Sequence, residues 1–378
     1  MKIVKLELHN WKNFPVAEVD VAQRMFVIGP NAAGKSNLLD ALLFLRDIAR
    51  SGGGLQEAIR QRGGLTKIRS LAARRYPLVE IKVTLQEDDQ KTWVYEIGIR
   101  QQNAGRRLPL LSYEKVTCDG NCIVNRPEDS DKEDDERLTQ TYLEQINANQ
   151  AFRDVARFLA SIRYLHLVPQ LVRNPAAYRG PERNSGQRED VHGLNFLDAL
   201  ARTTEKTRNA RLKKIEEALR QAVPQLKEFT FTKDESGVPH LQAIYEHWRA
   251  QGAKQQEDQF SDGTLRLLGL FWSLLDGDAP LLLEEPEISL NTEIVKKLPA
   301  LFHKLQRRNK RQIFVTTHSR EMLEDKGIDP GEVIELTPSA EGTKVQALSA
   351  NSKVTPLLQA GMSIADTISP SLQLDLAL

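Results

Sequence analysis

The sequence predicts an α/β protein with a parallel core sheet, an inserted antiparallel sheet and a mainly helical lobe. Three observations predict this class. A strand pattern ending at Ile28 runs into a glycine-rich segment and then into an apolar helix, LLDALLFLRDIAR. Later, APLLLEEPE and RQIFVTTHS are short apolar strands separated by the helical pattern EIVKKLPALFHKLQ, as in parallel sheets. Between Val79 and Val124, alternating strand patterns are separated by polar turns, as in antiparallel sheets.

The 378 residues suffice for two or three subdomains. We expect the following division: 1–127 as the N-terminal part of a head with the antiparallel sheet, 128–224 as a mainly helical lobe, 225–345 as the C-terminal part of the head, and 346–378 as a tail. The acidic segment EDSDKEDDER, over 128–137, predicts a solvated loop. Over 228–248, EFTFTKDESGVPHLQAIYEHW predicts a hairpin that turns at Ser236 and Gly237.

Composition excludes several classes. Lys and Arg total 52 against 51 for Asp and Glu, so net charge does not indicate a polyanionic partner. Two basic clusters, 60–75 and 303–311, stay open as contacts to a DNA or RNA backbone or as solvated helix ends. The two cysteines argue against a disulfide-stapled secreted domain, and no signal peptide or apolar run of membrane-spanning length is present. We therefore expect a cytoplasmic protein that does not enter the membrane.

The segment GPNAAGKS matches the pattern G-x-x-x-x-G-K-[ST] between a strand and a helix. Backbone N–H groups of such a loop curl round phosphate oxygens, Lys35 reaches the β and γ phosphates, and the Ser36 hydroxyl ligates Mg²⁺. A chance glycine-rich turn is the alternative, and the strand–helix context argues against it. The predicted nucleotide-binding residues here are Gly29, Pro30, Asn31, Ala32, Ala33, Gly34, Lys35, Ser36 and Asn37.

Two carboxylates follow the apolar strand LLL at 281–283. The carboxyl ends of strands open into the ligand crevice of α/β sheets, so we assign Glu284 to the metal shell and Glu285 to polarising the attacking water. The alternative is an acidic cap for the helix beyond. A third strand, IFVTTHS, delivers His318 to the same sheet edge, where it would contact the γ-phosphate. Lys35, Glu285 and His318 are therefore the catalytic candidates.

The segment QFSDGTLR precedes an apolar helix and, taken alone, could be a helix N-cap. In order with the other motifs it resembles the signature loop of ABC-type ATPases. The motifs HNWKNF, GPNAAGKSN, SDGTLR, LLLEEPEISLN and TTHS together resemble the branch that contains RecF, the structural-maintenance-of-chromosomes (SMC) proteins and the OLD ATPases. They cover roughly 1–50 and 225–335, and imply an ABC-type ATPase head whose mixed sheet has the phosphate loop at its core.

The resemblance implies a head-to-head dimer that binds ATP and Mg²⁺ between its subunits. Signature residues Ser261, Asp262 and Gly263 would contact the γ-phosphate held by the partner's Lys35, and 289–291 would touch the opposite subunit as the D-loop. The Mg²⁺-sensing glutamine is assigned to Gln170, with Gln86 as the alternative. Lys12 and Phe14 match the family's first loop and would lie beside the nucleotide.

The sequence also departs from the family pattern. Glu284 stands where many ABC proteins carry Asp, and Asn291-Thr292 replaces a frequent His-Pro pair. No long coiled coil or zinc-hook cysteine pair is present. About 60 residues follow His318, fewer than the Toprim nuclease domain of OLD proteins needs. The expectation is a stand-alone head with a short lobe.

The function implied is an ATPase switch, in which ATP joins two heads and hydrolysis separates them. It would serve DNA maintenance and repair or anti-phage defence, with a separately encoded nuclease or toxin. No residue of the sequence distinguishes the repair role from the defence role. The alternative is an ATP-binding sensor or scaffold that holds such a partner with little turnover. A transporter subunit is disfavoured because the segment Val79–His247 separates the phosphate loop from the signature.

Overall fold

A computed structural model describes residues 1–73, 77–102, 107–175, 192–220, 223–246, 252–352 and 354–372. Its contacts divide the chain into two compact units. The first unit comprises Met1–Ile162, Ala279–Leu282 and Arg311–Leu378, and the second comprises Arg163–Asp278 and Leu283–Lys310. Residues 128–162, which the sequence assigns to the helical lobe, thus belong with the N-terminal segments.

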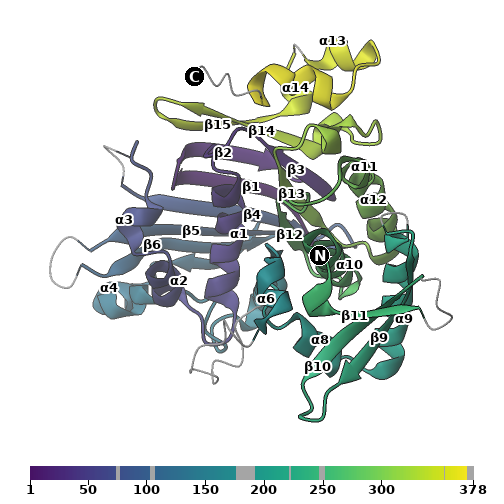
Figure 1. Cartoon of the computed structure of the whole chain (residues 1–378). Helices are drawn as coiled ribbons and strands as arrows, with labels where there is room; N and C mark the ends of the chain where they lie inside the picture. Colours follow the sequence, from purple (N-terminus) through teal and green to yellow (C-terminus); the bar gives the residue numbers. More distant parts are fainter. Residues whose placement is uncertain are drawn as a thin grey trace. The chain divides into compact units, whose positions relative to one another are not determined.

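The first unit contains a six-stranded antiparallel sheet of order β2-β1-β4-β5-β6-β7 (Figure 1). Its strands are β1 (Lys2–Trp11), β2 (Phe14–Asp20), β4 (Val79–Gln86), β5 (Thr92–Gln101), β6 (Pro109–Cys118) and β7 (Asn121–Arg126). In β4 every second side chain is buried, as expected for a sheet with one face on the core. The predicted antiparallel sheet is confirmed, and the first two strands extend it.

The core sheet has the order β15-β14-β3-β13-β12-β8. Its strands are β3 (Arg24–Ile28), β8 (Arg163–Leu165), β12 (Leu281–Glu284), β13 (Ile313–Thr317), β14 (Val333–Ser339) and β15 (Gly342–Ala347). β3 runs parallel to both β13 and β14, and all residues of β3 and β13 are buried. This burial explains the apolar runs 25–28 in β3 and 313–315 in β13. The boundary between the two units passes through β12, and β8 belongs to the second unit.

Helices of the first unit pack on these sheets. They are α1 (Lys35–Ala49), α2 (Leu55–Gln61), α3 (Leu65–Ile68), α4 (Asp129–Glu133), α5 (Arg153–Ser161), α13 (Val354–Gln359) and α14 (Ile364–Leu372), with short 3₁₀ turns at Asp135–Thr139, Gln150–Phe152, Glu321–Glu324, Pro330–Glu332 and Leu348–Ala350. The apolar face of α1 is buried and contacts α5. The Phe44 ring of α1 lies 5.2 Å from that of Trp11, so α1 is also fixed to β1.

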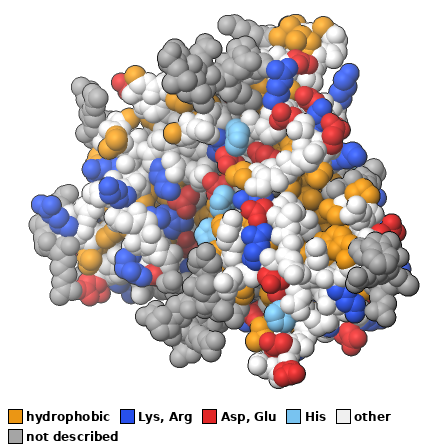
Figure 2. All heavy atoms as spheres, in the orientation of Figure 1, with side chains coloured by type: hydrophobic (Ala, Val, Ile, Leu, Met, Phe, Trp, Pro, Cys, Tyr) orange, Lys and Arg blue, Asp and Glu red, His pale blue; other side chains and the backbone are white. Residues whose placement is uncertain are grey.

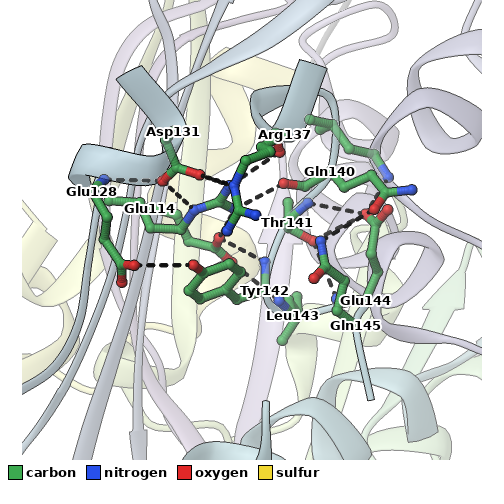
Figure 3. Close-up of polar contacts among 12 residues, drawn as sticks. Glu114, Glu128, Asp131, Arg137, Gln140, Thr141, Tyr142, Leu143, Glu144 and Gln145 are labelled. Atoms are coloured by element: carbon green, nitrogen blue, oxygen red, sulfur yellow. Dashed lines mark hydrogen bonds and ion pairs between the residues drawn. The ribbon is translucent and has the colours of Figure 1, made fainter. Parts of the chain in front are cut away.

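The acidic segment 128–137 is mostly exposed, as the sequence predicts, but it forms α4 and a 3₁₀ turn and not a loop. Its Asp131 is fully buried and pairs with the buried Arg126 at 2.8 Å. Arg126 also pairs with Glu114 of β6 at 3.2 Å, and Glu114 accepts hydrogen bonds from the amides of Tyr142 and Leu143 (Figure 3). A buried charge must be paired, and this cluster therefore anchors 128–143 to the antiparallel sheet.

The second unit is a helical lobe with a small sheet of order β11-β10-β9. Its elements are α6 (Pro169–Arg173), α8 (Phe196–Arg202), α9 (Glu205–Leu219), β9 (Leu226–Lys233), β10 (Pro239–Tyr245), β11 (Ala253–Gln256), a 3₁₀ turn at Glu257–Gln259, α10 (Asp262–Leu275), α11 (Thr292–Val295) and α12 (Leu298–Asn309). The predicted hairpin is confirmed by the antiparallel pairing of β9 and β10 and by the left-handed Gly237 (φ 80°).

One predicted helix of this unit is divided. The pattern EIVKKLPALFHKLQ forms α11 and α12, with Pro299 in the first turn of α12. Proline lacks an N–H and clashes with the preceding helical turn, so it starts a new helix here. Among the described residues of both units, no helix is long and apolar enough to cross a bilayer.

Candidate nucleotide-binding site

The glycine-rich loop lies in the first unit and connects β3 to α1. Ala32 (φ 64°) and Gly34 (φ 98°) adopt left-handed conformations that curl the backbone into an anion-binding concavity. A Cβ at Gly34 would lie 2.1 Å from the Asn13 amide nitrogen, and one at Gly29 would lie 2.6 Å from the Leu336 carbonyl oxygen. Both glycines are therefore required by close packing around the loop.

Polar side chains brace this loop from outside. The Asn13 amide donates to the Ala33 carbonyl at 2.9 Å and to the Thr343 hydroxyl at 2.7 Å. The Thr343 hydroxyl donates to the same carbonyl at 2.9 Å, and the Asn37 amide donates to the Asn13 carbonyl oxygen at 2.7 Å. The sequence reasoning missed Asn13 and Thr343 as site residues. Asn13 lies within HNWKNF and could have been found there, whereas Thr343, 330 residues away, carries no such signal.

Lys35 is held inside the loop. Its ammonium donates to the carbonyls of Gly29 at 3.0 Å and Pro30 at 3.3 Å, and the residue is only 7% exposed. The first turn of α1 contains no acidic side chain, so its positive partial charge is not cancelled locally. A lysine, curled backbone amides and a helix N-terminus together favour a polyphosphate.

A cavity of about 750 Å³ lies in the same unit and is bordered by Lys12, Asn13 and Asn37. Its other walls come from the segment 66–72 with Arg62, and from the β14–β15 turn at 339–342. Most of the lining residues are polar, and its charged residues are the basic Lys12, Arg62, Lys67 and Arg69 and the acidic Glu341. Because Asn37 belongs to the first turn of α1, the cavity opens beside the phosphate loop.

The two residues predicted from the family's first loop lie in different environments. Lys12 is on the cavity wall, with its ammonium 2.6 Å from the Asp40 carboxylate. Phe14 is fully buried, so it does not face a ligand and the expectation for it is wrong. Phe14 is the first residue of β2, and its ring packs into the core. Asn13, which directly precedes this strand, reaches the phosphate loop.

His318 follows β13 at the edge from which the phosphate loop leaves β3. The parallel register pairs Thr317 with Ile28, so His318 and Gly29 emerge side by side. His318 is exposed, while its neighbour Ser319 is fixed by its amide donating to the Thr317 hydroxyl at 2.9 Å. A contact between His318 and a γ-phosphate stays a prediction.

The paired carboxylates end β12. The strand starts beside β13, where the Leu281 amide donates to the Gln312 carbonyl at 2.9 Å. Glu284, its last residue, accepts a hydrogen bond from the Tyr164 hydroxyl within the second unit. Glu285 follows in a left-handed conformation, with φ 43°. This conformation costs a residue with a side chain about 1–2 kcal/mol, and such strain concentrates at functional sites.

The signature segment begins α10 in the second unit. Ser261 is exposed and caps the helix by accepting from the Thr264 amide at 3.2 Å. The Asp262 carboxylate is held by Arg173 at 2.6 Å and by the Gln170 amide at 3.4 Å. The sequence predicts that Gln170 ends a strand. In the structure β8 stops at Leu165, and Gln170 lies in α6. Its predicted role with Mg²⁺ thus stays a proposal.

The D-loop segment adjoins the signature. A Cβ at Gly263 would lie 3.1 Å from the Ser289 carbonyl oxygen, so only a small residue fits without movement. Ser289 is exposed and left-handed (φ 63°), and Asn291 caps α11 by accepting from the Glu293 amide at 2.8 Å. These two predicted subunit-contacting segments are therefore adjacent in one unit.

Comparison with known proteins gives the family. A model of the family described as "AAA domain, putative AbiEii toxin, Type IV TA system" matches residues 24–324. The chain belongs to this family. The description of the family names an AAA domain, and the order of motifs in this chain is similar to that of the RecF- and SMC-like branch.

Relatives of this AAA family member agree with that placement. The DNA replication and repair protein RecF of Synechocystis is 29% identical over 113 residues, which span 29% of this chain and 28% of RecF. The SMC head bound to the C-winged helix domain of ScpA superposes with a TM-score of 0.54 at 16% identity, covering 92% of this chain and 98% of that one. The Pyrococcus furiosus SMC head, bound to the C-terminal domain of ScpA, gives 0.52 at 15%, covering 95% and 98%. The fold is SMC head-like.

The residues of the AAA domain fit ATP with Mg²⁺. Within the described part of the chain no three His, Cys, Asp or Glu side chains cluster as metal ligands. Mg²⁺ needs no such cage, because it is usually held by one or two protein oxygens together with substrate phosphates. Three ligands were predicted, Ser36 in the first unit and Gln170 and Glu284 in the second, and their binding of Mg²⁺ stays a prediction.

Arginines of the first basic cluster form ion pairs with carboxylates outside it, and one arginine of the second cluster is buried. Arg62 is paired with Asp40 at 2.7 Å, Arg60 pairs with Glu57 at 2.8 Å, and Arg311 is buried. Arg74 and Arg75 lie outside the described residues. On the face drawn in Figure 2, basic and acidic side chains are both spread over the surface. Arg62 and Arg311 are therefore not solvated helix ends, whereas Arg60 is exposed in the last turn of α2.

Proposed function

We propose that this chain binds ATP in the phosphate loop of its first unit and hydrolyses it in a head-to-head dimer. The carrying observation is the braced loop around Lys35 with a polar cavity beside it. The exposed N-terminus of α10 supports the second half of the proposal. Ser261, the backbone of Asp262 and Gly263 would reach the γ-phosphate held by the partner's Lys35.

Each catalytic candidate has a chemical task in this proposal. Lys35 stabilises negative charge on the β and γ phosphates, and Mg²⁺, when bound, neutralises further charge on their oxygens. Glu285 accepts a proton from the attacking water, and its left-handed backbone is a strained conformation of the kind found at functional sites. His318 donates to the γ-phosphate from the neighbouring strand.

The proposed dimer acts as a switch, because ATP contributes contacts between subunits only while its γ-phosphate is attached. A role in DNA maintenance and repair is supported by the partial match to RecF. A role in defence, with a separate nuclease or toxin as effector, is supported by the description of the family. The SMC heads that share the fold bind ScpA, which supports a protein partner here. Contact with a nucleic-acid backbone and a cytoplasmic location belong to the same proposal.

Complementation between two inactive variants tests the shared site. Lys35→Ala removes the phosphate grip, and Ser261→Arg blocks the signature loop. Each variant alone should release almost no phosphate. In a 1:1 mixture, half of the dimers pair the two variants and carry one complete site each, so about a quarter of wild-type activity should return.

Two matched controls decide the interpretation. Mixing Lys35→Ala with Lys35→Ala/Ser261→Arg creates no complete site and should stay inactive. Activity in Ser261→Arg alone, or a 1:1 mixture as inactive as its components although both variants are folded, would refute the shared site. Equal turnover of wild type and Glu285→Gln would instead favour the sensor or scaffold alternative.

A further inference from the structure

Asp40 lies in the second turn of α1, and no motif singles it out. Its carboxylate is 2.6 Å from the Lys12 ammonium and 2.7 Å from the Arg62 guanidinium. Arg62 binds it in a bidentate manner, since its Nε also contacts Asp40 at 2.9 Å. The Asp40 side chain is 17% exposed. One buried carboxylate thus joins two cations that come from separate segments of the first unit.

Arg62 is itself fixed on several sides. It donates to Asp47 at 3.0 Å and to the Ala58 carbonyl at 2.9 Å, and its guanidinium lies 5.1 Å from the centre of the Phe44 ring. Because Asp40, Phe44 and Asp47 all belong to α1, Arg62 is locked on the same helix that begins at the phosphate loop. A bidentate arginine with these contacts fixes the direction of the Asp40 carboxylate.

The charge balance keeps Asp40 ionised. Burial alone would raise the pKa of Asp40, but hydrogen bonds from Arg62 and the charges of Arg62 and Lys12 outweigh it and hold that pKa below its usual value. Lys12 has three N–H donors on a flexible chain, and one ionised, fixed acceptor is enough to restrict where the ammonium lies. Arg62 therefore fixes the position of the Asp40 carboxylate, and Asp40 in turn fixes the position of the Lys12 ammonium.

Lys12 and Arg62 both border the 750 Å³ cavity beside the phosphate loop, together with Asn13 and Asn37. Resting on the function proposed above, we propose that Asp40 is a positioning residue that holds Lys12 on the cavity wall, where Lys12 binds the nucleoside end of the nucleotide. All three phosphates are bound by the loop around Lys35, whereas the ribose lies against Lys12. Asp40 therefore acts on recognition of the nucleoside and not on recognition of the triphosphate tail.

Comparing ATP with inorganic tripolyphosphate, which lacks the nucleoside, tests this division. Asp40→Asn keeps the shape but removes the charge that holds Lys12. We expect it to weaken Mg·ATP binding about tenfold, the scale of a lost charge-assisted hydrogen bond. Binding of Mg·tripolyphosphate should stay close to wild type. Lys12→Met should give the same selective loss, and the double variant should be no weaker than either single one, because both remove one interaction.

Glu57→Gln is the matched control, since Glu57 is a carboxylate of α2 that pairs with Arg60 and not with Lys12. It should bind both ligands as wild type does. Equal losses for ATP and tripolyphosphate in Asp40→Asn would show a general role in folding the loop and would overturn the proposal. If Asp40→Asn fails to fold, Lys12→Met decides alone, and wild-type ATP binding by it would refute the proposal. A wild-type protein that binds neither ligand would instead refute the proposed function.

Discussion

Asp262 poses an electrostatic problem in the proposed dimer, because a carboxylate would stand at the helix end that meets a triphosphate. In the second unit Arg173 removes this problem: it donates to Asp262 at 2.6 Å and to the Phe260 carbonyl at 2.8 Å. Both side chains are about one-third exposed, so the ion pair itself contributes at most about 1 kcal/mol to folding. Its greater effect should be on ATP-driven dimerisation.

The expected magnitude follows from Coulomb's law. An unpaired carboxylate roughly 6 Å from a phosphate charge is repelled by about 1–3 kcal/mol at an effective dielectric constant of 20–40. Arg173→Met exposes that charge and should weaken the dimer formed with ATP about 10- to 100-fold. Light scattering over a range of protein concentrations measures this, with Glu285→Gln as the background that retains ATP.

A second substitution separates charge from shape. In Arg173→Met/Asp262→Asn the negative charge is gone, so the ATP-dependent dimer should return to within a few-fold of the parent. Raising the salt concentration should also reduce the difference in dimer affinity between Arg173→Met and its parent, because exposed charges are screened. An unchanged dimer in Arg173→Met, or a loss that Asp262→Asn does not restore, would refute the assignment of Arg173 as the counter-charge.

Two further predictions concern the first unit. Gly34→Ala places a Cβ against the Asn13 amide at a residue with a left-handed backbone. The variant should not bind a fluorescent ATP analogue, and its circular dichroism spectrum should show little change in secondary structure. Tight binding of the analogue by this variant would contradict the braced loop. The hydrogen bonds of Arg126 lower the pKa of Asp131 from 3.8 to about 2. A carboxyl group with a lowered pKa stabilises the fold at pH values above its pKa in the unfolded chain. This stabilisation is lost as the pH falls from about 4 to about 2. The free energy of unfolding of Asp131→Asn, measured with urea at pH 6, should therefore be about 2 kcal/mol lower than that of wild type. This difference should shrink as the pH falls from about 4 to about 2. A difference that does not depend on pH would count against this pairing.

Much of the fold follows from sequence patterns. Strand alternation located β4 to β7, and the apolar segments located β3, β12 and β13, because burial of one or both faces dictates those patterns directly. The phosphate loop was placed fully, since its glycines and lysine are demanded by local backbone geometry. Short or interrupted elements were less predictable: the strand expected to reach Gln170 ends at Leu165.

Tertiary packing accounts for what the patterns missed. The segment 128–137 is largely exposed, but Asp131 is buried because Arg126, five residues before it, is itself buried against Glu114 of β6. Phe14 was expected beside the nucleotide, but β2 turns its ring into the core and presents Asn13 instead. Such outcomes depend on which segments meet, which is not encoded in any single window of sequence.

The sequence by itself determined the order of motifs and most of the elements that carry them, and it predicts the chemistry of Lys35, Glu285 and His318, because these depend on residue type and local conformation. Only the tertiary structure decided that Asn13 and Thr343 brace the loop, that Arg173 holds Asp262, and that Asp40 joins Lys12 to Arg62. The physical reason is that hydrogen bonds and ion pairs form between groups a few ångströms apart, whatever their separation along the chain.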